Sequence, residues 1–206
     1  MTDSSGALRL ILASQSPRRA DILGQLGLKP EILPADVDES LLQQERPAEH
    51  VERLARAKAG HIAERERDAL VVGGDTIVVH KDAIVGKPKD EGAAIDMLND
   101  LSGSRHEVLS GIAVAGPHGI VSTVATATVR MRTYDRNTSA AYVATGEPMD
   151  KAGGYGIQGL GASLVESVDG DYYAVIGFPV ASFVHLLEAI GFRYDFGVIQ
   201  PKKISD

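Results

Sequence analysis

The sequence predicts an α/β protein with a mixed central sheet flanked by helices. In the N-terminal part of the chain, apolar runs of strand length alternate with amphipathic helical segments, which gives strand–helix–strand steps. Two longer strand-like runs, 107–114 and 121–132, are separated only by Gly116-Pro117-His118-Gly119, which is typical of a hairpin with a loop of several residues. Strand–helix–strand steps and a hairpin in one chain indicate a mixed sheet.

The first apolar run, 8–12, predicts a buried strand that leads through a short polar turn into a helix over 17–26. Ser16 suits the N-cap, because its hydroxyl can accept from a free backbone N–H. Arg18 and Arg19 follow in the first turn of this helix, where the partial positive charge of the helix N-terminus favours acidic residues. The two arginines therefore need a bound anion unless both extend into solvent. For these residues alone, extension into solvent is the commoner outcome.

A long amphipathic helix is predicted over 47–65, after a short strand at 31–33 and an acidic loop at 34–40. Lys58 lies in the middle of the apolar stripe of this helix. Its ammonium must therefore either extend past the stripe to water, which is the commoner outcome, or meet an anion.

Residues 69–74 predict a buried strand that ends at Asp75, with extended chain beyond it. Ligands gather at the C-terminal ends of strands in open α/β sheets, so a carboxylate there can bind a metal or orient a water. The acidic loop adds Asp36, Asp38 and Glu39, and Mg²⁺ needs only one or two protein carboxylates besides substrate phosphates. The alternatives are that Asp75 caps a turn and that the acidic loop is only solvated.

The remaining elements are shorter. They are a turn at 81–82, a helix to residue 101 capped by Asp90, a helix over 137–145, a strand over 163–168, a turn at 170–171 leading into 172–176, and a helix over 179–190. A polar tail is expected from about residue 192, loose from Lys202. We treat residues 1–206 as a single domain, long enough to form two lobes.

Two lysines and a glutamine lie in loops rich in turn formers. Lys87 and Lys151 each precede such a stretch; loops carry function disproportionately, although solubilising surface lysines are common. Residues 154–159 match G-x-G-x-x-G, but they neither follow a strand nor open a helix, so a dinucleotide site is rejected. A loop around a planar ligand fits better, with Gln158 offering donor and acceptor groups to a base edge. The alternative is a structural loop.

Composition limits the classes of function. The absence of cysteine excludes disulfides, thiolate zinc sites and a cysteine nucleophile, and there is no G-x-S-x-G motif. The formal net charge of −7 argues against a broad nucleic-acid-binding face but not against a small anionic ligand. Residues 1–7 lack the features of a signal peptide and no apolar run approaches ~18 residues, so we expect a cytoplasmic protein without membrane or nucleic-acid partners.

Several short segments, taken in their order along the chain, form a recognisable set of motifs. They are Leu12-Ala13-Ser14-Gln15-Ser16-Pro17-Arg18-Arg19, Val37-Asp38-Glu39, Leu54-Ala55 with Lys58-Ala59, Gly74-Asp75-Thr76, Gly86-Lys87-Pro88, Leu101-Ser102-Gly103, Glu147-Pro148-Met149-Asp150-Lys151-Ala152-Gly153, Tyr155-Gly156-Ile157-Gln158-Gly159, and Gly170-Asp171-Tyr172-Tyr173 with Gly177-Phe178-Pro179. In this order they resemble the motifs of the Maf family of nucleotide pyrophosphatases, from about Leu10 to about Ile190. One departure is Gly74, where the family often has Ala.

The resemblance implies a fold, a reaction and an assembly. The implied fold is an elongated mixed sheet flanked by helices, with two lobes around a nucleotide-binding cleft, similar to that of ITPases. The family hydrolyses nucleoside triphosphates between the α- and β-phosphates, releases a monophosphate and pyrophosphate, and needs a divalent metal, Mg²⁺ or Mn²⁺. A homodimer is also implied.

The resemblance further implies roles for individual residues. Asp75 would be the catalytic carboxylate that activates water, and Glu39 and Asp75 would hold the metal. Arg18, Thr76 and Gln158 would set the base preference, and these residue types match the subgroup that acts on dTTP and UTP. The full set expected to bind substrate is Ser14, Ser16, Arg18, Arg19, Lys58, Thr76, Lys87, Lys151 and Gln158.

Two alternatives stay open. The first is the same chemistry on another base, such as a modified pyrimidine triphosphate, an ITP-like purine or 7-methyl-GTP, whose subgroup carries Trp, Gln and Glu at the three specificity positions. Thr76 and Gln158 weakly favour a pyrimidine. The second is a non-enzymatic regulator of cell division, although no long exposed apolar stretch marks a partner surface.

Overall fold

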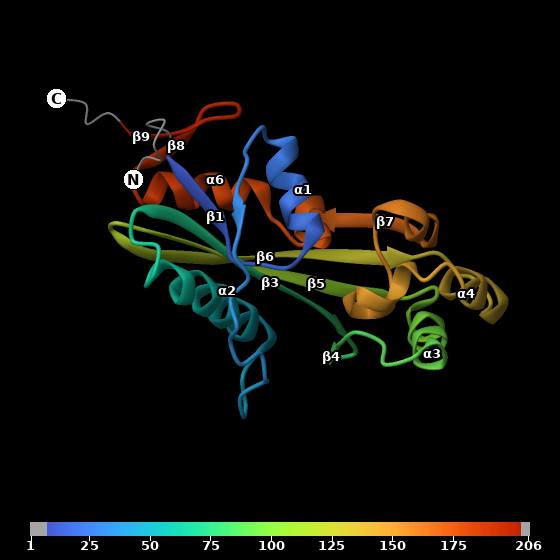
Figure 1. Cartoon of the computed structure of the whole chain (residues 1–206). Coiled ribbons are helices and arrows are strands. Elements are labelled where there is room, and N and C mark those ends of the chain that lie inside the picture. The colour runs from blue at the N-terminus through green and yellow to red at the C-terminus, as the bar shows by residue number, and fades with distance from the viewer. Residues whose placement is uncertain (1–7, 203–206) are drawn as a thin grey trace. The chain divides into compact units, whose positions relative to one another are not determined.

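The computed structural model describes residues 8–202 and confirms the α/β class with a mixed sheet. The strands of this sheet are β1 (Arg9–Leu12), β2 (Glu31–Ile32), β3 (Ala69–His80), β4 (Ala83–Val85), β5 (Arg105–Gly116), β6 (Gly119–Met131) and β7 (Val165–Gly170). Their hydrogen-bonded order is β2-β1-β3-β5-β6-β7, with β4 paired to β3 (Figure 1). β1 pairs parallel with β2 and β3, whereas β4 and β7 pair antiparallel with β3 and β6.

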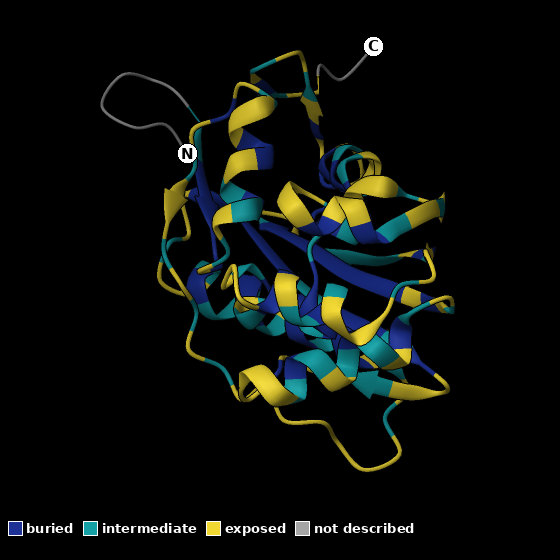
Figure 2. Ribbon diagram, turned by 90° about the vertical axis from the view of Figure 1, so that its right-hand side faces the viewer, coloured by how far each residue is buried: buried dark blue, intermediate teal, exposed yellow. Residues whose placement is uncertain are grey.

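The chain divides into two compact units. Of the described residues, unit 1 contains 8–75, 110–125 and 177–202, and unit 2 contains 76–109 and 126–176. Strands β3, β5 and β6 each contribute residues to both units. Figure 2 shows much of the strand backbone as buried, whereas the helices carry exposed residues on one side.

Helices cover both faces of the sheet in unit 1. These helices are α1 (Pro17–Gln25), α2 (Pro47–Ala63) and α6 (Val180–Ala189), and Figure 1 shows α2 on the face opposite α1 and α6. Between α2 and the strands lies a core made mostly of small side chains: Ile11, Ala13, Ala55, Ala59, Ile62, Ala69, Val71, Ala113 and Ala115. Small side chains let the helix backbone come close to the sheet.

Two glycines of the sheet make this close approach possible. A Cβ atom on Gly73 of β3 would lie 2.3 Å from the Ala55 carbonyl oxygen and 2.7 Å from the Ala59 nitrogen. A Cβ atom on Gly111 of β5 would lie 2.2 Å from the Val51 carbonyl oxygen. The backbone of α2 therefore rests directly on the strands, and no other residue type fits at these two positions.

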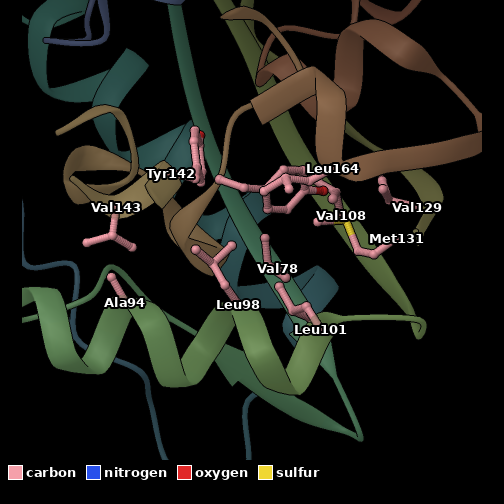
Figure 3. Close-up of a cluster of buried hydrophobic side chains, with 11 residues drawn as sticks. Val78, Ala94, Leu98, Leu101, Val108, Val129, Met131, Tyr142, Val143 and Leu164 are labelled. Carbon is pink, nitrogen blue, oxygen red and sulfur yellow. The ribbon is translucent and has the colours of Figure 1, made fainter. Parts of the chain in front are cut away.

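Unit 2 has a core of larger side chains beneath its helices and turns. Its further elements are the helices α3 (Glu91–Leu101), α4 (Arg136–Val143) and α5 (Tyr172–Ile176) and the 3₁₀ turns η1 (Glu147–Asp150), η2 (Ala152–Gly154) and η3 (Gly159–Leu164). Figure 3 shows Leu98 and Leu101 of α3 pointing toward Val78 of β3 and Leu164 of η3. The predicted cap of α3 is confirmed, because the Asp90 carboxylate accepts from the Ala93 N–H at 2.7 Å.

Three local predictions differ from the structure. The stretch expected to begin the polar tail forms a hairpin, β8 (Phe192–Tyr194) and β9 (Ile199–Pro201), and residues 203–206 lie outside the described part. β7 begins at Val165 rather than at Ser163, because the Ser163 hydroxyl donates to the Leu160 carbonyl within η3. Asp75 lies within β3 and not at its end, because the strand continues to His80.

Among residues 8–202, no helix combines the length and the apolar composition that a bilayer crossing requires.

Replacing Gly73 with Ala should lower the free energy of unfolding by about 1–3 kcal/mol, because the methyl group would meet the backbone of α2 and force the helix off the sheet. Chemical denaturation of the two proteins would measure the difference. Gly24→Ala is the control: a Cβ there has no atom within 4 Å, and the exposed helix should gain about 0.5–1 kcal/mol. Equal stability of Gly73→Ala and the parent protein would show that the close approach is not needed.

Candidate active site

The Lys58 ammonium holds two carboxylates together in unit 1. Lys58 projects from the sheet-facing side of α2 with only 9% of its side chain exposed, so it does not extend to water. Its Nζ atom lies 2.8 Å from Asp75 Oδ1 and 2.6 Å from Glu39 Oε1. A buried ammonium is stable only when paired with an opposite charge, and here it has two such partners.

Asp75 lies just beyond the parallel part of the sheet. The register pairs Leu12, the last residue of β1, with Val72 of β3, and the Ala13 N–H still donates to the Val72 carbonyl. Three residues farther along β3, the Asp75 side chain has no β1 strand beside it. The prediction that Asp75 ends a strand was wrong, but the carboxylate does lie where the parallel strand pairing stops.

Arg19 and Ser14 form a second polar cluster in unit 1. Arg19 is only 8% exposed; its Nε donates to the Gly177 carbonyl at 2.9 Å and its Nη1 donates to Ser14 Oγ at 2.8 Å. Burial lowers the pKa of the Arg19 guanidinium, while the nearby charge of Asp75 acts in the opposite direction. Arg19 therefore does not extend into solvent, although that is the commoner outcome for such a residue taken alone; Arg18 is half-buried.

The Ser16 prediction also needs correction. Ser16 occupies the N-cap position of α1, but within residues 8–202 its hydroxyl makes no cap hydrogen bond. The neighbouring hydroxyl supports the turn instead, because Ser14 Oγ accepts both from the Ser16 N–H, at 3.2 Å, and from Arg19.

The loop that carries Glu39 is fastened to α2 by residues that the sequence did not single out. The Arg53 guanidinium donates to the Ser40 carbonyl at 3.0 Å and to the Glu45 carboxylate at 2.5 Å. Glu45 also lies 2.9 Å from His50 Nδ1, and the hydrogen bond from Arg53 holds the pKa of Glu45 well below its usual range. The periodicity of the helix did not indicate this clamp, because Ser40 and Glu45 lie outside the helix.

The predicted residues of unit 2 lie in adjoining loops. The Gly153 N–H donates to the Gly86 carbonyl at 3.1 Å, which joins the loops that carry Lys87 and Lys151. Lys87 is exposed, whereas Lys151 Nζ lies 2.5 Å from the Glu147 carbonyl oxygen and 2.6 Å from Asp150 Oδ1.

Thr76 and Gln158 also belong to unit 2. Thr76 directly follows Asp75 on β3 and is half-buried. Gln158 is exposed at the start of η3, and its amide has no hydrogen-bond partner in the described chain. Its amide is thus available to a ligand.

A buried histidine anchors the Gln158 loop to the sheet. His106 Nε2 of β5 lies 2.7 Å from the hydroxyl oxygen of Tyr155, and the two rings meet edge to face. Burial lowers the pKa of His106 to about 4, with a smaller lowering from His80, and burial raises the pKa of the Tyr155 phenol. His106 is therefore neutral at pH 7 and holds Tyr155 three residues before Gln158.

Oxygen ligands for a divalent cation are present in unit 1. The carboxylates of Glu39 and Asp75 already converge on one cation, the Lys58 ammonium. No group of three or more His, Cys, Asp or Glu residues suited to a metal occurs among residues 8–202. One or two carboxylates completed by phosphate oxygens and water is the donor set that Mg²⁺ takes, so these residues fit such an ion.

Comparisons with known proteins agree with the resemblance found in the sequence. The family described as Maf-like protein matches residues 9–190. A dTTP/UTP pyrophosphatase of Moorella thermoacetica is 47% identical over 187 residues, covering 89% of this chain and 95% of that protein. One of Aquifex aeolicus is 41% identical over 183 residues, covering 89% of this chain and 96% of that protein.

Among solved structures, the Staphylococcus aureus Ham1 protein is similar in fold. It aligns with a TM-score of 0.51 and 15% identity, covering 88% of this chain and 97% of that chain. This likeness supports the predicted mixed α/β fold.

Acidification should destabilise the protein through His106. The folded-state pKa of about 4 lies below the ordinary value of 6.5, so the unfolded chain takes up the proton first. The stabilisation is complete above pH 6.5 and is lost as the pH falls toward 4. In His106→Gln, the stability lost between pH 7 and pH 5 should be smaller than in the parent by about 2 kcal/mol, measured by urea unfolding. An equal loss in both proteins would contradict this assignment.

Proposed function

The chain belongs to the Maf-like protein family, and from this premise we propose that it hydrolyses dTTP and UTP to the nucleoside monophosphate and pyrophosphate. Relatives that are 41% and 47% identical over most of the chain are named dTTP/UTP pyrophosphatase. The structural observation that carries the proposal is the pair of carboxylates, Glu39 and Asp75, joined by the Lys58 ammonium. This arrangement combines a general base, ligands for a cation and a positive charge for phosphate.

Positively charged side chains can offset the negative charge of a triphosphate substrate. A triphosphate carries about four negative charges near neutral pH, and hydrolysis at phosphorus depends mainly on positioning and charge stabilisation. We assign Lys58 and Arg19 of unit 1 to this task. Lys58 has three N–H groups, so it can donate to a phosphate oxygen as well as to its carboxylate partners.

Three residues are proposed to read the base. Arg18, Thr76 and Gln158 carry the residue types of the dTTP/UTP subgroup, and the Gln158 amide has no hydrogen-bond partner within residues 8–202. Lys87 and Lys151 in the adjoining loops supply further positive charge for the phosphates.

Asp75 is proposed as the general base. Its carboxylate would accept the proton of the attacking water while the bond between the α- and β-phosphates breaks and pyrophosphate leaves. Lys58 holds one oxygen of this carboxylate at 2.8 Å and thereby fixes its orientation. Glu39 and Asp75 would hold Mg²⁺ or Mn²⁺, which when bound neutralises phosphate charge and lowers the pKa of bound water.

We propose that the enzyme acts on free nucleotides in the cytoplasm and has no nucleic-acid or membrane partner. The net charge of −7 supports the absence of a nucleic-acid partner. The homodimer rests on the family resemblance, and light scattering of the purified chain would test it.

Replacing Asp75 with Asn should lower the rate of pyrophosphate release from dTTP by at least about 100-fold, because the amide cannot accept a proton. The measurement is pyrophosphate release with Mg²⁺ or Mn²⁺ across a panel of dTTP, UTP, CTP, ITP and 7-methyl-GTP. The parent protein should favour dTTP and UTP. Near-normal turnover by the variant would show that Asp75 is not the general base. If the parent protein released no pyrophosphate from any triphosphate, a binding protein would be favoured instead.

Arg18 and Arg19 should respond differently to substitution. Arg18→Gln should change the order of preference within the nucleotide panel, because Arg18 occupies a position that varies with the base. Arg19→Gln should lower kcat/KM for every nucleotide by about tenfold or more, because it removes a buried charge that also fixes Ser14. Steady-state kcat/KM for each nucleotide would distinguish the two. A uniform loss in Arg18→Gln would assign both arginines to the phosphates.

A further inference from the structure

The Glu147 carboxylate lies at the centre of the loop that carries Gln158. Its Oε1 atom accepts from the Tyr142 hydroxyl at 2.8 Å and from the Gly161 N–H at 3.0 Å, and its Oε2 atom accepts from the Leu160 N–H at 2.9 Å. One side chain thus fixes the backbone that follows Gln158 by two direct hydrogen bonds. Hydrogen bonds to a charged acceptor are the strong ones.

The same carboxylate also reaches the backbone before Gln158. The Tyr142 hydroxyl donates to Glu147 and accepts from the Gly156 N–H at 3.2 Å. Gly156, Leu160 and Gly161 flank Gln158 on both sides, and all three N–H groups depend on this network. Burial, and after it the hydrogen bond to Glu147, raises the pKa of Tyr142. Burial acts to raise the pKa of Glu147, but the hydrogen bonds from Gly161 and Leu160 hold it below its usual range.

Three glycines of this loop have no space for a side chain. A Cβ atom on Gly161 would lie 2.4 Å from the Gly156 carbonyl oxygen and 2.5 Å from the Tyr142 hydroxyl, and one on Gly159 would lie 2.8 Å from Glu147 Oε2. A Cβ atom on Gly156 would lie 2.8 Å from Lys151 Cε. Of the glycines in the G-x-G-x-x-G match, Gly159 therefore allows the close contact with Glu147, and Gly156 allows the close contact with Lys151.

We propose that Glu147 is the positioning residue that sets nucleobase recognition, acting on Gln158 through the backbone of residues 156–161. This inference rests on the proposed function and adds a residue to its base-reading part. The exposed Gln158 amide makes no hydrogen bond of its own within residues 8–202, so its backbone is what fixes the position from which the side chain extends. A fixed backbone reduces the range of positions from which the amide can meet a base edge, and a loosened backbone widens that range.

Glu147→Gln is the sharpest variant because it keeps the shape of the side chain. Its amide has one acceptor oxygen where the carboxylate has two, so an –NH₂ group must face a backbone N–H at Leu160 or Gly161. Glu166→Gln is the matched control: Glu166 lies on β7 in the same unit and pairs with Arg130 at 2.8 Å, with both side chains about half exposed.

The first measurement is steady-state kinetics with UTP, dTTP and CTP. Glu147→Gln should raise KM for UTP and dTTP by about 10- to 100-fold, with kcat within about twofold of the parent value. It should also reduce the ratio of kcat/KM for UTP and dTTP to kcat/KM for CTP. A loss of folded protein alone would lower kcat and leave KM unchanged. Glu166→Gln should match the parent protein.

The second measurement keeps the inference testable if Glu147→Gln folds poorly. Tyr142→Phe removes only the hydroxyl that links Glu147 to Gly156, and it should also raise KM, by a smaller factor.

Hydrogen exchange tests the loop itself. In Glu147→Gln, the amides of Leu160 and Gly161 should exchange hydrogen at least about tenfold faster than in Glu166→Gln.

Opposite results separate the two proposals. If the parent protein cleaves UTP while Glu147→Gln and Tyr142→Phe keep its KM and its preference over CTP, Glu147 has no positioning role and the proposed function stands. If the parent protein cleaves no triphosphate, the proposed function fails first.

Discussion

The ion pairs of Lys58 depend on how closely α2 approaches the sheet. Gly73 of β3 faces the backbone of α2 between Ala55 and Ala59, and Lys58 lies in that same turn of the helix. Two residues after Gly73, β3 presents Asp75, whose carboxylate is 2.8 Å from Lys58 Nζ. A helix held farther from the strand by one methyl group would carry the ammonium away from Asp75. The glycine contact therefore determines the geometry of the proposed reaction centre.

The same physical logic recurs in unit 2. There a carboxylate, Glu147, gathers backbone N–H groups from both sides of Gln158, and glycines again allow the contacts to be short. In unit 1 a side-chain cation joins side-chain anions, whereas in unit 2 a side-chain anion fixes a backbone. In each unit a buried or half-buried charge orders the groups around it. Burying a charge is unfavourable, so such an arrangement is expected only where the position of a side chain matters.

Periodicity in the sequence predicted most of the regular structure. The helices α2, α3 and α6 and the β5–β6 hairpin were expected within a few residues of their bounds, because each has a clear apolar face. The hairpin β8–β9 was missed because each of its strands has only three residues. Such short strands carry too few residues for alternation to be recognised.

The candidate site was less accessible to sequence reasoning. Lys58 was conspicuous because a charge interrupted an apolar stripe, but nothing in the spacing revealed its partners, which lie 17 and 19 positions away in the chain. Arg53 and Glu147 were missed because their roles depend on tertiary contacts with Ser40 and with Leu160 and Gly161. Residues of this kind are recognised only when the folded backbone is known.

The most direct test of the central claim is a crystal structure of the protein with a non-hydrolysable α,β-imido analogue of dUTP and Mn²⁺, with the metal located by anomalous scattering. The account predicts that the metal is bound by the carboxylate of Glu39 or Asp75 together with phosphate oxygens, and that Lys58 contacts the triphosphate. A triphosphate and metal bound without contact to Glu39, Lys58 or Asp75 would contradict it.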